Sequence, residues 1–338
     1  MKTRIAVVVT AALLVLAGCG GGQDTGSADT GVGDTDVATG GRLFKTADED
    51  TAKLGSDAQP GVFPRTVKHA LGESKLDKKP ERVVVLDSGE LDDVLALGIT
   101  PVGMATTAGQ NGVPSYLADK AQGIKTVGGI SELNLEAIAA LKPDLILGSK
   151  LRANDLYDKL SAIAPTVFSI RPGFPWKENF LLVADAVGEE DKATAILNDY
   201  QKRANEVKSK VQGSPTISLV RFRPGEIRLY GNLSFIGVIL KDVGLPRPKI
   251  QDVQDLAVEV SQENIGQAAG DRIFYSSYGK PDTTDETKIV NGNLWKSLAA
   301  VKAGKAERVD DEVWFLGLGP IGAMKVLDDL QKLLAAKG

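Results

Sequence analysis

Histidine, cysteine and tryptophan are scarce in this sequence, which contains one His, one Cys and three Trp among its 338 residues. With one His, neither a His-ligated zinc or manganese site nor a His-based catalytic triad is expected. With one Cys, the chain cannot form an internal disulfide framework. The G-x-S-x-G nucleophile motif and the G-x-x-x-x-G-K-[ST] phosphate-binding motif are absent as well. These absences argue against an enzyme and favour a binding protein.

A large excess of charge of either sign is also absent. The formal net charge is −4, and loss of Lys2 and Arg4 with an amino-terminal leader would make it −6. Nucleic acid is therefore not expected as a partner, because a nucleic-acid-binding protein presents a basic surface. A chain of 338 residues is longer than one ordinary core requires and suits two domains of about 120 residues each.

The single cysteine stands at the end of an apolar leader. Lys2 and Arg4 precede the apolar residues 5–17, a stretch too short for a comfortable membrane span. The leader ends in Leu-Ala-Gly-Cys19, which resembles the lipobox of bacterial lipoproteins. This resemblance implies that residues 1–18 are a signal peptide and that Cys19 carries a lipid. The alternative is an ordinary buried or free thiol at Cys19.

The segment after Cys19 contains almost no large apolar residue. Residues 20–60 are mainly Gly, Asp, Thr, Ser and Ala, so they cannot bury enough apolar surface to fold. We therefore expect a disordered tether over residues 19–62. A lipid and a tether place the protein on the extracytoplasmic face of the cell membrane, anchored but not spanning it.

One long helix organises the rest of the chain. Residues 189–211 contain no Gly or Pro, begin with three acidic residues and end close after two lysines, which complements the helix dipole. Apolar residues recur along it at helical spacing and predict one buried stripe. At about 1.5 Å per residue this helix would be roughly 34 Å long, enough to cross a domain.

The segments on either side of this helix share a pattern. Glu136-Ala-Ile is followed by Asp144 eight positions after the Glu, and Glu263-Asn-Ile is followed by Asp271 at the same interval. Each copy predicts a short helix that carries a Glu in its first turn and leads into a buried strand. This repetition indicates two similar lobes, one before the long helix and one after it.

Strands alternate with helices through both halves, which predicts an α/β fold with two Rossmann-like lobes and a ligand cleft between them. Strands over residues 216–223 and 226–230 should form a hairpin around Pro224-Gly225. Residues 312–316 are expected to be a strand. The predicted boundaries are an N-terminal lobe over residues 63–174, connecting helices over 175–211 and a C-terminal lobe over 212–338.

Arginines and aromatic residues gather where loops at the carboxyl ends of the strands should face the other lobe. Arg221 and Arg223 alternate with apolar residues, so both point to one side of a strand. Their planar guanidinium groups suit the oxygens of an anionic ligand, although a salt-bridged pair on an outer face is the alternative. The predicted ligand-binding residues are Arg221, Arg223, Arg228, Tyr230, Trp176, Arg152, Tyr278, Trp314 and Phe174.

Some of these residues have plain structural interpretations. Arg152 stands in what could be an ordinary charged helix start, and Trp176 and Trp314 could each pack in a core instead of forming a ligand platform. Asp92 and Asp93 are expected on a solvated helix face. Residues 317–322 spell G-x-G-x-x-G, but the 16 residues that remain cannot complete a dinucleotide-binding unit.

Residues 63–335 resemble the siderophore and vitamin B12 class of substrate-binding proteins that serve ABC importers. The matching segments are RVVVLDSGELDDVLALGITPVG, VGGISELNLEAIAALKPDLILGS, VEVSQENIGQAAGDRIF and NGNLWKSLAAVKAG. The resemblance implies two α/β lobes joined by a single long helix, with the ligand in a shallow cleft. It also implies that Glu136 and Glu263 grip an ABC permease dimer, although both could merely favour helix N-termini. A monomer is expected.

Two further segments, SLVRFRPGEIRLYGNLSFIGVILKDVGLPRP and TVFSIRPGFPWKENF, are similar to lipoproteins for ferric siderophores, especially hydroxamates of the ferrioxamine type. The resemblance implies that arginines donate to the hydroxamate oxygens while the iron stays coordinated by the siderophore. The expected function is capture of a ferric siderophore for iron uptake, with no cofactor, no catalytic residue and no metal ligand from the protein. The role of His69, where relatives often have His, stays unassigned.

Other ligands and functions stay open. Arg221, Arg223 and Arg228 together could equally serve a triply anionic catecholate, and a corrinoid or haem carrier could use the same scaffold. A surface hydrolase using Asp87 and Glu90 is an alternative of a different class, but the sequence offers no nucleophile–base pair. A structural adhesion lipoprotein would not need two matching docking carboxylates.

Overall fold

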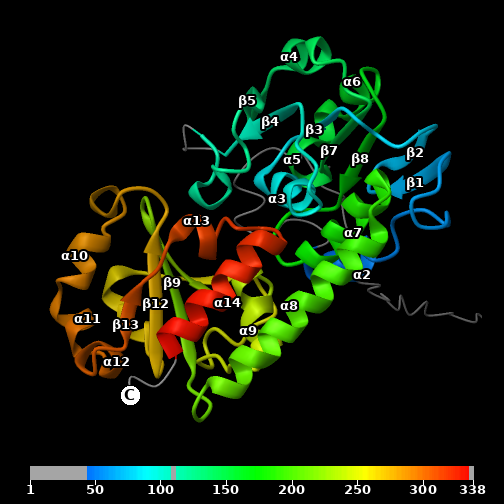
Figure 1. Ribbon diagram of the computed structural model, residues 1–338. Helices are drawn as coiled ribbons and strands as arrows, with labels where there is room; N and C mark the ends of the chain where they lie inside the picture. Colours follow the sequence, from blue (N-terminus) through cyan, green and yellow to red (C-terminus); the bar gives the residue numbers. More distant parts are fainter. Residues whose placement is uncertain (1–43, 108–111, 335–338) are drawn as a thin grey trace, which may run out of the picture.

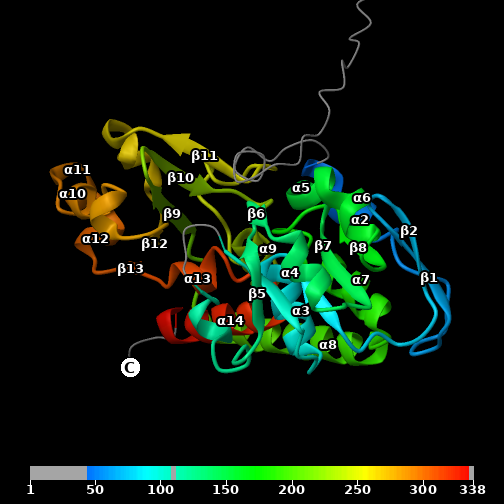
Figure 2. The same cartoon turned by 90° about the horizontal axis from the view of Figure 1, so that it is seen from above.

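The computed structural model of the protein describes residues 44–107 and 112–334. Two α/β lobes lie side by side and are joined by a long helix (Figures 1 and 2). This arrangement confirms the predicted fold class. Within the described residues, no helix combines the length and apolar character needed to cross a membrane.

The first lobe contains a six-stranded sheet in the order β6-β5-β4-β3-β7-β8. Neighbouring strands are parallel except β6, which runs antiparallel to β5. Val83 and Val85 pack on one face of the sheet and Val84 on the other, so the central strand is buried on both sides. The strands are β3 (Val83–Val85), β4 (Gly103–Thr106), β5 (Lys125–Gly129), β6 (Glu132–Leu133), β7 (Leu145–Ser149) and β8 (Thr166–Ser169).

Short polar side chains start the helices of this lobe. The Asp87 carboxylate accepts a hydrogen bond from the Ser88 amide at 2.6 Å, and Asn134 Oδ1 accepts one from the Ala137 amide at 2.9 Å. The helices are α3 (Ser88–Ala96), η2 (Ser115–Leu117), α4 (Leu135–Ala140), α5 (Lys150–Ala153), η3 (Asn154–Leu156) and α6 (Tyr157–Ser161).

The second lobe contains a five-stranded sheet in the order β11-β10-β9-β12-β13. The predicted hairpin is present as β9 (Ile217–Arg223) and β10 (Glu226–Tyr230), and its turn places Gly225 at a φ of +78°. The other elements are β11 (Ala257–Val260), β12 (Arg272–Ser277), β13 (Ala306–Arg308), α9 (Phe235–Val243), η4 (Gln262–Ala268), η5 (Pro281–Thr283), α10 (Glu286–Val290), α11 (Asn293–Ser297), α12 (Ala299–Lys302), α13 (Asp311–Trp314) and α14 (Pro320–Leu334).

Two consecutive helices connect the lobes. α7 (Trp176–Val187) ends at Gly188 in the left-handed conformation, and α8 (Glu190–Lys210) follows as the long helix (Figure 1). The predicted helix over residues 189–211 is therefore confirmed to within one residue at each end. Its buried stripe joins two cores, because Ala193 packs in the first lobe while Tyr200, Ala204 and Val207 pack in the second.

Residues 44–62, predicted as the last part of the tether, are folded against the body. η1 (Phe44–Thr46) and α2 (Ala47–Thr51) lead to the hairpin of β1 (Arg65–His69) and β2 (Gly72–Leu76). Ala47 is fully buried, and the Gly55 and Lys68 backbones exchange two hydrogen bonds of 2.9 Å. The tether prediction was wrong over this range because small residues can pack closely wherever a neighbouring surface receives them.

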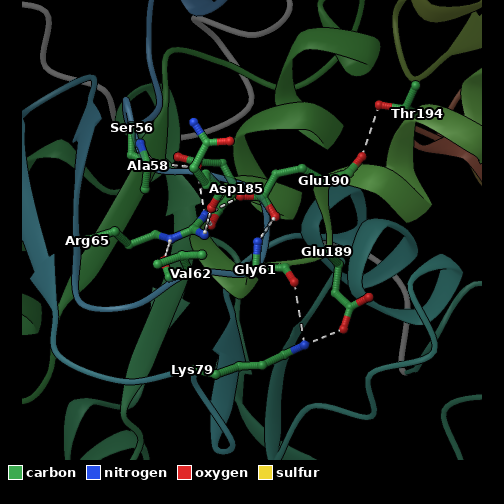
Figure 3. A network of polar contacts seen from close by, with 12 residues as sticks. Ser56, Ala58, Gly61, Val62, Arg65, Lys79, Asp185, Glu189, Glu190 and Thr194 are labelled. Atoms are coloured by element: carbon green, nitrogen blue, oxygen red, sulfur yellow. Dashed lines mark hydrogen bonds and ion pairs between the residues drawn. The ribbon is translucent and has the colours of Figure 1, made fainter.

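Arg65 fastens this amino-terminal segment to the junction of α7 and α8 (Figure 3). Its Nη1 donates to the Asp185 carbonyl at 2.6 Å and to Asp185 Oδ1 at 2.9 Å, and it also pairs with Glu190. Its Nε donates to the Val62 carbonyl at 2.9 Å, and Ser56 Oγ donates to Asp185 Oδ1 at 2.6 Å. The Arg65 side chain is 0% exposed, so this network is a buried structural fastening.

One local prediction in the second lobe was wrong, whereas the short helix predicted around Glu263 is present. The strand expected over residues 312–316 is instead α13, because Asp310 Oδ1 accepts from the Glu312 amide at 2.9 Å and caps a helix start. The segment around Glu263 is a 3₁₀ helix, η4, rather than an α-helix.

Candidate ligand-binding site

A cavity lies between the two lobes and includes about 840 Å³ of space with its open mouth. The first lobe contributes Thr107, Ile130 and Arg152, and the segment after β8 contributes Arg171 and Phe174. Further lining residues come from the second lobe, chiefly from the β9–β10 hairpin and the segment around α13. The described residues that line it include five arginines and no acidic residue: Arg152, Arg171, Arg221, Arg223 and Arg228. A lining of five arginines and several aromatic side chains suits an anionic small molecule.

The hairpin register places two arginines opposite each other. Arg221 in β9 pairs with Arg228 in β10, and Arg223 pairs with Glu226. Directly opposed like charges destabilise a sheet unless other charges offset them. Acidic side chains outside the cavity lining supply this offset: Asp311, Glu226 and Glu259.

Arg221 is held rigidly at the cavity wall. Asp311 accepts two hydrogen bonds from it, Nε to Oδ1 at 2.8 Å and Nη2 to Oδ2 at 2.6 Å, and Nη1 lies 3.1 Å from the Tyr230 hydroxyl. The rings of Tyr278 and Phe315 lie 4.8 and 5.3 Å from its guanidinium carbon. Burial, the largest influence, lowers the pKa of Arg221, but Tyr230 and Asp311 together raise it above its ordinary value. Arg221 is therefore a fixed positive charge.

Arg223 and Arg228 are less completely satisfied. Arg223 Nη1 pairs with Glu226 at 2.5 Å, while Arg228 Nη2 lies 3.2 Å from Glu226 and 3.3 Å from Glu259. The Nε atoms of both arginines are buried and make no hydrogen bond within the part of the chain that the structure describes. A buried N–H donor without an acceptor costs free energy, so an oxygen-rich ligand would gain by accepting from these groups.

The first lobe closes the opposite wall. Arg152 Nε donates to Asp87 Oδ2 at 3.0 Å, and its side chain is 10% exposed at the cavity. Phe174 is buried and lines the cavity with Arg171, whose guanidinium carbon lies 5.9 Å from its ring centre.

The two tryptophans singled out from the sequence differ. Trp176 does not line the cavity; it is fully buried and packs edge-on against Tyr200 at 5.0 Å between ring centres. The core-packing alternative is the correct one for Trp176. Trp314 lines the cavity but is also fully buried, packed 5.0 Å from Phe274, with Nε1 donating to Asp329 at 3.1 Å. Trp314 therefore belongs mainly to the core behind the cavity wall and exposes almost no ring surface on which a ligand could stack.

The predicted ligand-binding set includes eight of the 21 described residues that line the cavity, among them four of the five arginines. Arg171 follows the carboxyl end of β8 in a loop that the sequence also places at the cleft, but it was not in the predicted ligand-binding set. The apolar residues carried no signal of their own, because isolated leucines are common in any core. Apolar lining residues outside the predicted set include Ile130, Leu233, Phe235, Ile236, Leu256, Phe315, Leu316 and Leu318.

Leu318 lies within the glycine-rich turn of residues 317–322, and Leu316 precedes it. Backbone amides of this turn bind the carboxylate of Asp92. Asp92 of α3 accepts from the Ile321 amide at 2.8 Å and from the Gly322 amide at 2.9 Å, at the N-terminus of α14. A Cβ atom at Gly319 would lie 2.6 Å from Asp92 Cβ, so this close approach requires glycine. The turn joins the lobes beside the cavity.

The buried position of Asp92 corrects the expectation of a solvated face. Asp92 and Asp93 are 0% and 1% exposed, and burial raises the pKa of Asp92 to about 7. Tyr116 donates its hydroxyl to Asp92 at 2.9 Å and adds a third hydrogen bond. The sequence could not reveal this burial because the covering helix α14 begins more than two hundred positions later in the chain.

The carboxylates required by a hydrolase are not presented to the cavity. Glu90 has a pKa raised to about 8, mainly by burial and then by Asp87, but it is 5% exposed and does not line the cavity. Asp87 is paired with Arg152 and caps α3. Neither residue is placed to act on a bound molecule.

The remaining predicted residues lie away from the cavity. Glu136 and Glu263 are exposed, in the first turns of α4 and η4, one on each lobe. His69 is buried where the β1–β2 hairpin meets the first lobe; its Nδ1 accepts from the Leu71 amide at 3.2 Å, and burial lowers its pKa to about 4. His69 is therefore neutral and structural. Cys19 lies outside the described residues.

Two α/β lobes on either side of a cavity, joined by one long helix, define the class of extracytoplasmic substrate-binding proteins. The family model described as periplasmic binding protein matches residues 83–312, and the chain belongs to this family, as the resemblance implied.

Individual relatives agree with this assignment. The chain is 41% identical over 281 residues to the probable siderophore-binding lipoprotein YfiY of Bacillus subtilis, covering 79% of this chain and 86% of the relative. It is 31% identical to the Fe(3+)-citrate-binding protein YfmC of the same organism, over 77% and 82% of the two chains. The structure of Staphylococcus aureus SirA complexed with staphyloferrin B matches with a TM-score of 0.72 at 31% identity, over 80% and 98%.

Proposed function

We propose that this chain captures a ferric siderophore in the cavity between its lobes and delivers it to an ABC permease for iron uptake. The observation that carries this proposal is the group of five arginines around a cavity whose described lining has no acidic residue. Similarity to a probable siderophore-binding lipoprotein and to a staphyloferrin B complex supports the proposal.

The proposed chemistry is recognition of outer oxygens, with the iron left to the siderophore. Guanidinium groups donate to oxygens that already bind the metal or lie beside it, and such charge-assisted hydrogen bonds are strong in a buried site. Tyr230, Tyr278 and Phe315 surround Arg221 and would cover the carbon skeleton of the ligand. No protein side chain needs to enter the coordination sphere of the iron.

The charge of the cavity refines the predicted hydroxamate class. A ferric trihydroxamate core is neutral, because three hydroxamate charges balance those of the ferric ion. Four of the cavity arginines pair with Asp87, Asp311, Glu226 and Glu259, but guanidinium donors at a cavity still favour a ligand with additional negative charge, since charge-assisted hydrogen bonds are the strong ones. We therefore propose a hydroxamate siderophore that also bears carboxylate groups, and expect it to bind more tightly than ferrioxamine.

Calorimetric titration of the protein with a panel of complexes tests this function. The panel comprises ferric aerobactin, which combines hydroxamates with citrate, ferrioxamine B, ferric citrate, a ferric triscatecholate, haem and cobalamin, with the iron-free siderophores as controls. Saturable submicromolar binding of ferric aerobactin, tighter than that of ferrioxamine B, is expected. If only haem or cobalamin binds, the ligand is a haem or a corrinoid and the siderophore proposal is wrong. If no complex binds, the proposed ligand-capture function is wrong.

Delivery is proposed to depend on Glu136 and Glu263. Both are exposed and stand on different lobes, as two contacts with a dimeric permease require. The double variant Glu136→Ala/Glu263→Ala should keep its ligand affinity and lose radioactive iron uptake in cells. The matched control is Glu73→Ala/Glu206→Ala, which removes two other exposed carboxylates. Normal uptake by the docking variant would contradict the assignment.

A further inference from the structure

The amino-terminal helix α2 touches the back of the cavity wall. Ala47 and Phe174 form one buried cluster, 0% and 3% exposed, and Leu233, Val238 and Leu256 pack against it. Phe174, Leu233 and Leu256 also line the cavity. Phe174, which packs with Ala47, therefore lies between α2 and the cavity, and Leu233 and Leu256 pack beside it.

The segment that carries α2 is fixed at one end and contacts both lobes. On its carboxyl side, Ser56 bonds to Asp185 of α7, and the Gly55 backbone pairs with Lys68 of β1 (Figure 3 shows Ser56 and Asp185). On its amino side, Ala47 packs in one cluster with Phe174, and Leu233, Val238 and Leu256 of the second lobe pack against that cluster. Thr46 Oγ1 donates to Asp50 Oδ2 at 2.9 Å and holds the short helix together. α2 thus lies across the connection between the lobes.

We propose that α2 is a brace that positions Phe174, Leu233 and Leu256 and thereby sets the shape of the apolar side of the ligand cavity. The inference rests on the proposed function for the identity of the ligand, but the bracing itself is a property of the unliganded protein. If α2 docking stabilises the wall shape that binds ligand, docking raises ligand affinity by some factor, and bound ligand raises the docking equilibrium constant by the same factor. Occupation of the cavity would then tighten the attachment of the segment that leads to the amino terminus.

Ala47→Asp is the decisive substitution, and Ala52→Asp is its matched control. An Asp at position 47, the first residue of the helix, suits the helix dipole but cannot stay in an apolar cluster, so it undocks the helix without destroying it. Ala52 is exposed at the opposite end of α2, where the same substitution opposes the dipole slightly. Any larger effect at position 47 therefore reports loss of docking.

Hydrogen–deuterium exchange of the full-length protein without ligand tests the bracing directly. We expect Ala47→Asp to accelerate exchange of the Leu233 and Val238 amides, which are hydrogen-bonded at 3.1 and 3.0 Å, while Ala52→Asp does not. Faster exchange in α2 alone, with these amides unchanged, would overturn the proposal. If Ala47→Asp fails to fold, the milder Ala47→Val, which overpacks the same cluster, is used with the same criterion.

Titration with ferric aerobactin and ferrioxamine B then tests the consequence for binding. If undocking leaves the wall correctly shaped in about one molecule in ten, the apparent Kd rises about tenfold. Ala52→Asp should bind as the wild type does. Equal affinity of Ala47→Asp and the wild type would refute the brace alone, whereas a wild type that binds neither complex would count against the proposed ligand and leave the exchange experiment to decide the bracing.

Discussion

Arg65 and the cavity arginines Arg223 and Arg228 differ in how many of their N–H donors have a hydrogen-bond acceptor. Arg65 is 0% exposed, and the acceptors around it are two carboxylates and the carbonyls of its own segment and of α7. Arg223 and Arg228, at the cavity, each keep a buried Nε without a hydrogen bond among the described residues. The first arrangement needs no further acceptor, whereas the second lacks acceptors that, under the proposed function, an oxygen-rich ligand would supply.

The difference teaches how a structural arginine is told from a ligand-binding one. Both kinds are buried, both have carboxylate partners, and both pack against aromatic rings, since Arg65 lies 4.5 Å from the Phe63 ring centre. The distinguishing feature is access to the cavity; Arg223 and Arg228 in addition keep an unused Nε donor, whereas Nε, Nη1 and Nη2 of Arg221 all have partners. Removal of Arg65 should therefore damage the fold, and removal of a cavity arginine should damage binding.

The largest effect is expected for Arg65→Met. The substitution leaves the Asp185 and Glu190 carboxylates partly buried without their cation, which typically costs about 3–5 kcal/mol of unfolding free energy. Urea denaturation measures this loss, and the fraction that remains folded should bind its ligand with unchanged affinity. A stable variant with weakened binding would reverse the roles assigned to the two groups.

A smaller effect, on affinity, is expected for Arg221→Ala. Loss of a charged donor to a ligand oxygen should weaken binding of the preferred ferric complex by about 1.5–3 kcal/mol, as calorimetry would measure. Arg203→Ala is the control, because Arg203 lies outside the cavity lining, where it pairs with Asp328 in the second lobe. Unchanged affinity in Arg221→Ala would remove this residue from the site.

The smallest effect concerns the carboxylates that join the lobes. Burial raises the pKa of Asp92 to about 7 and that of Asp93 also, above the values they have in the unfolded chain. Above about pH 4 the folded protein therefore keeps protons on these carboxyls that the unfolded chain releases. The contribution of Asp92 and Asp93 to the free energy of unfolding is greatest below about pH 4 and decreases as the pH rises. The contribution of Asp92 should fall by about 2 kcal/mol as the pH rises from 5 to 7, and that of Asp93 should fall in the same direction.

Asp92→Asn tests this pH dependence. The amide cannot titrate and keeps only one of the two oxygen acceptors at the N-terminus of α14, so the variant should be less stable at acidic pH and should have a flatter pH profile. Urea midpoints between pH 5 and 8 would show it, with the exposed Asp199→Asn of α8 as control. An unaltered slope in Asp92→Asn would place the titration elsewhere.

The sequence predicted those features that local pattern determines. The long helix, the β9–β10 hairpin and the arginines on it follow from composition and alternation over a few residues. All the predicted ligand-binding residues except Trp176 line the cavity. Their roles as ligand contacts stay predictions.

The features that failed depend on contacts between distant segments. Asp92 accepts hydrogen bonds from the start of α14. Ala47 is buried in a cluster with Phe174, against which residues that follow β10 also pack. Trp176 was ambiguous because an aromatic residue near a loop serves a core or a cavity equally well, and only its packing on Tyr200 decides between them. Such outcomes depend on tertiary packing, which overrides local sequence preference.

The most direct test of the central claim is the position of iron in crystals of the loaded protein. Anomalous diffraction at the iron absorption edge, after addition of ferric aerobactin, should show one peak in the cavity beside Arg221, Arg223 and Arg228. No protein atom should coordinate the metal, because the siderophore supplies its ligands. Iron bound directly by protein side chains, or located away from the arginine wall, would contradict the account.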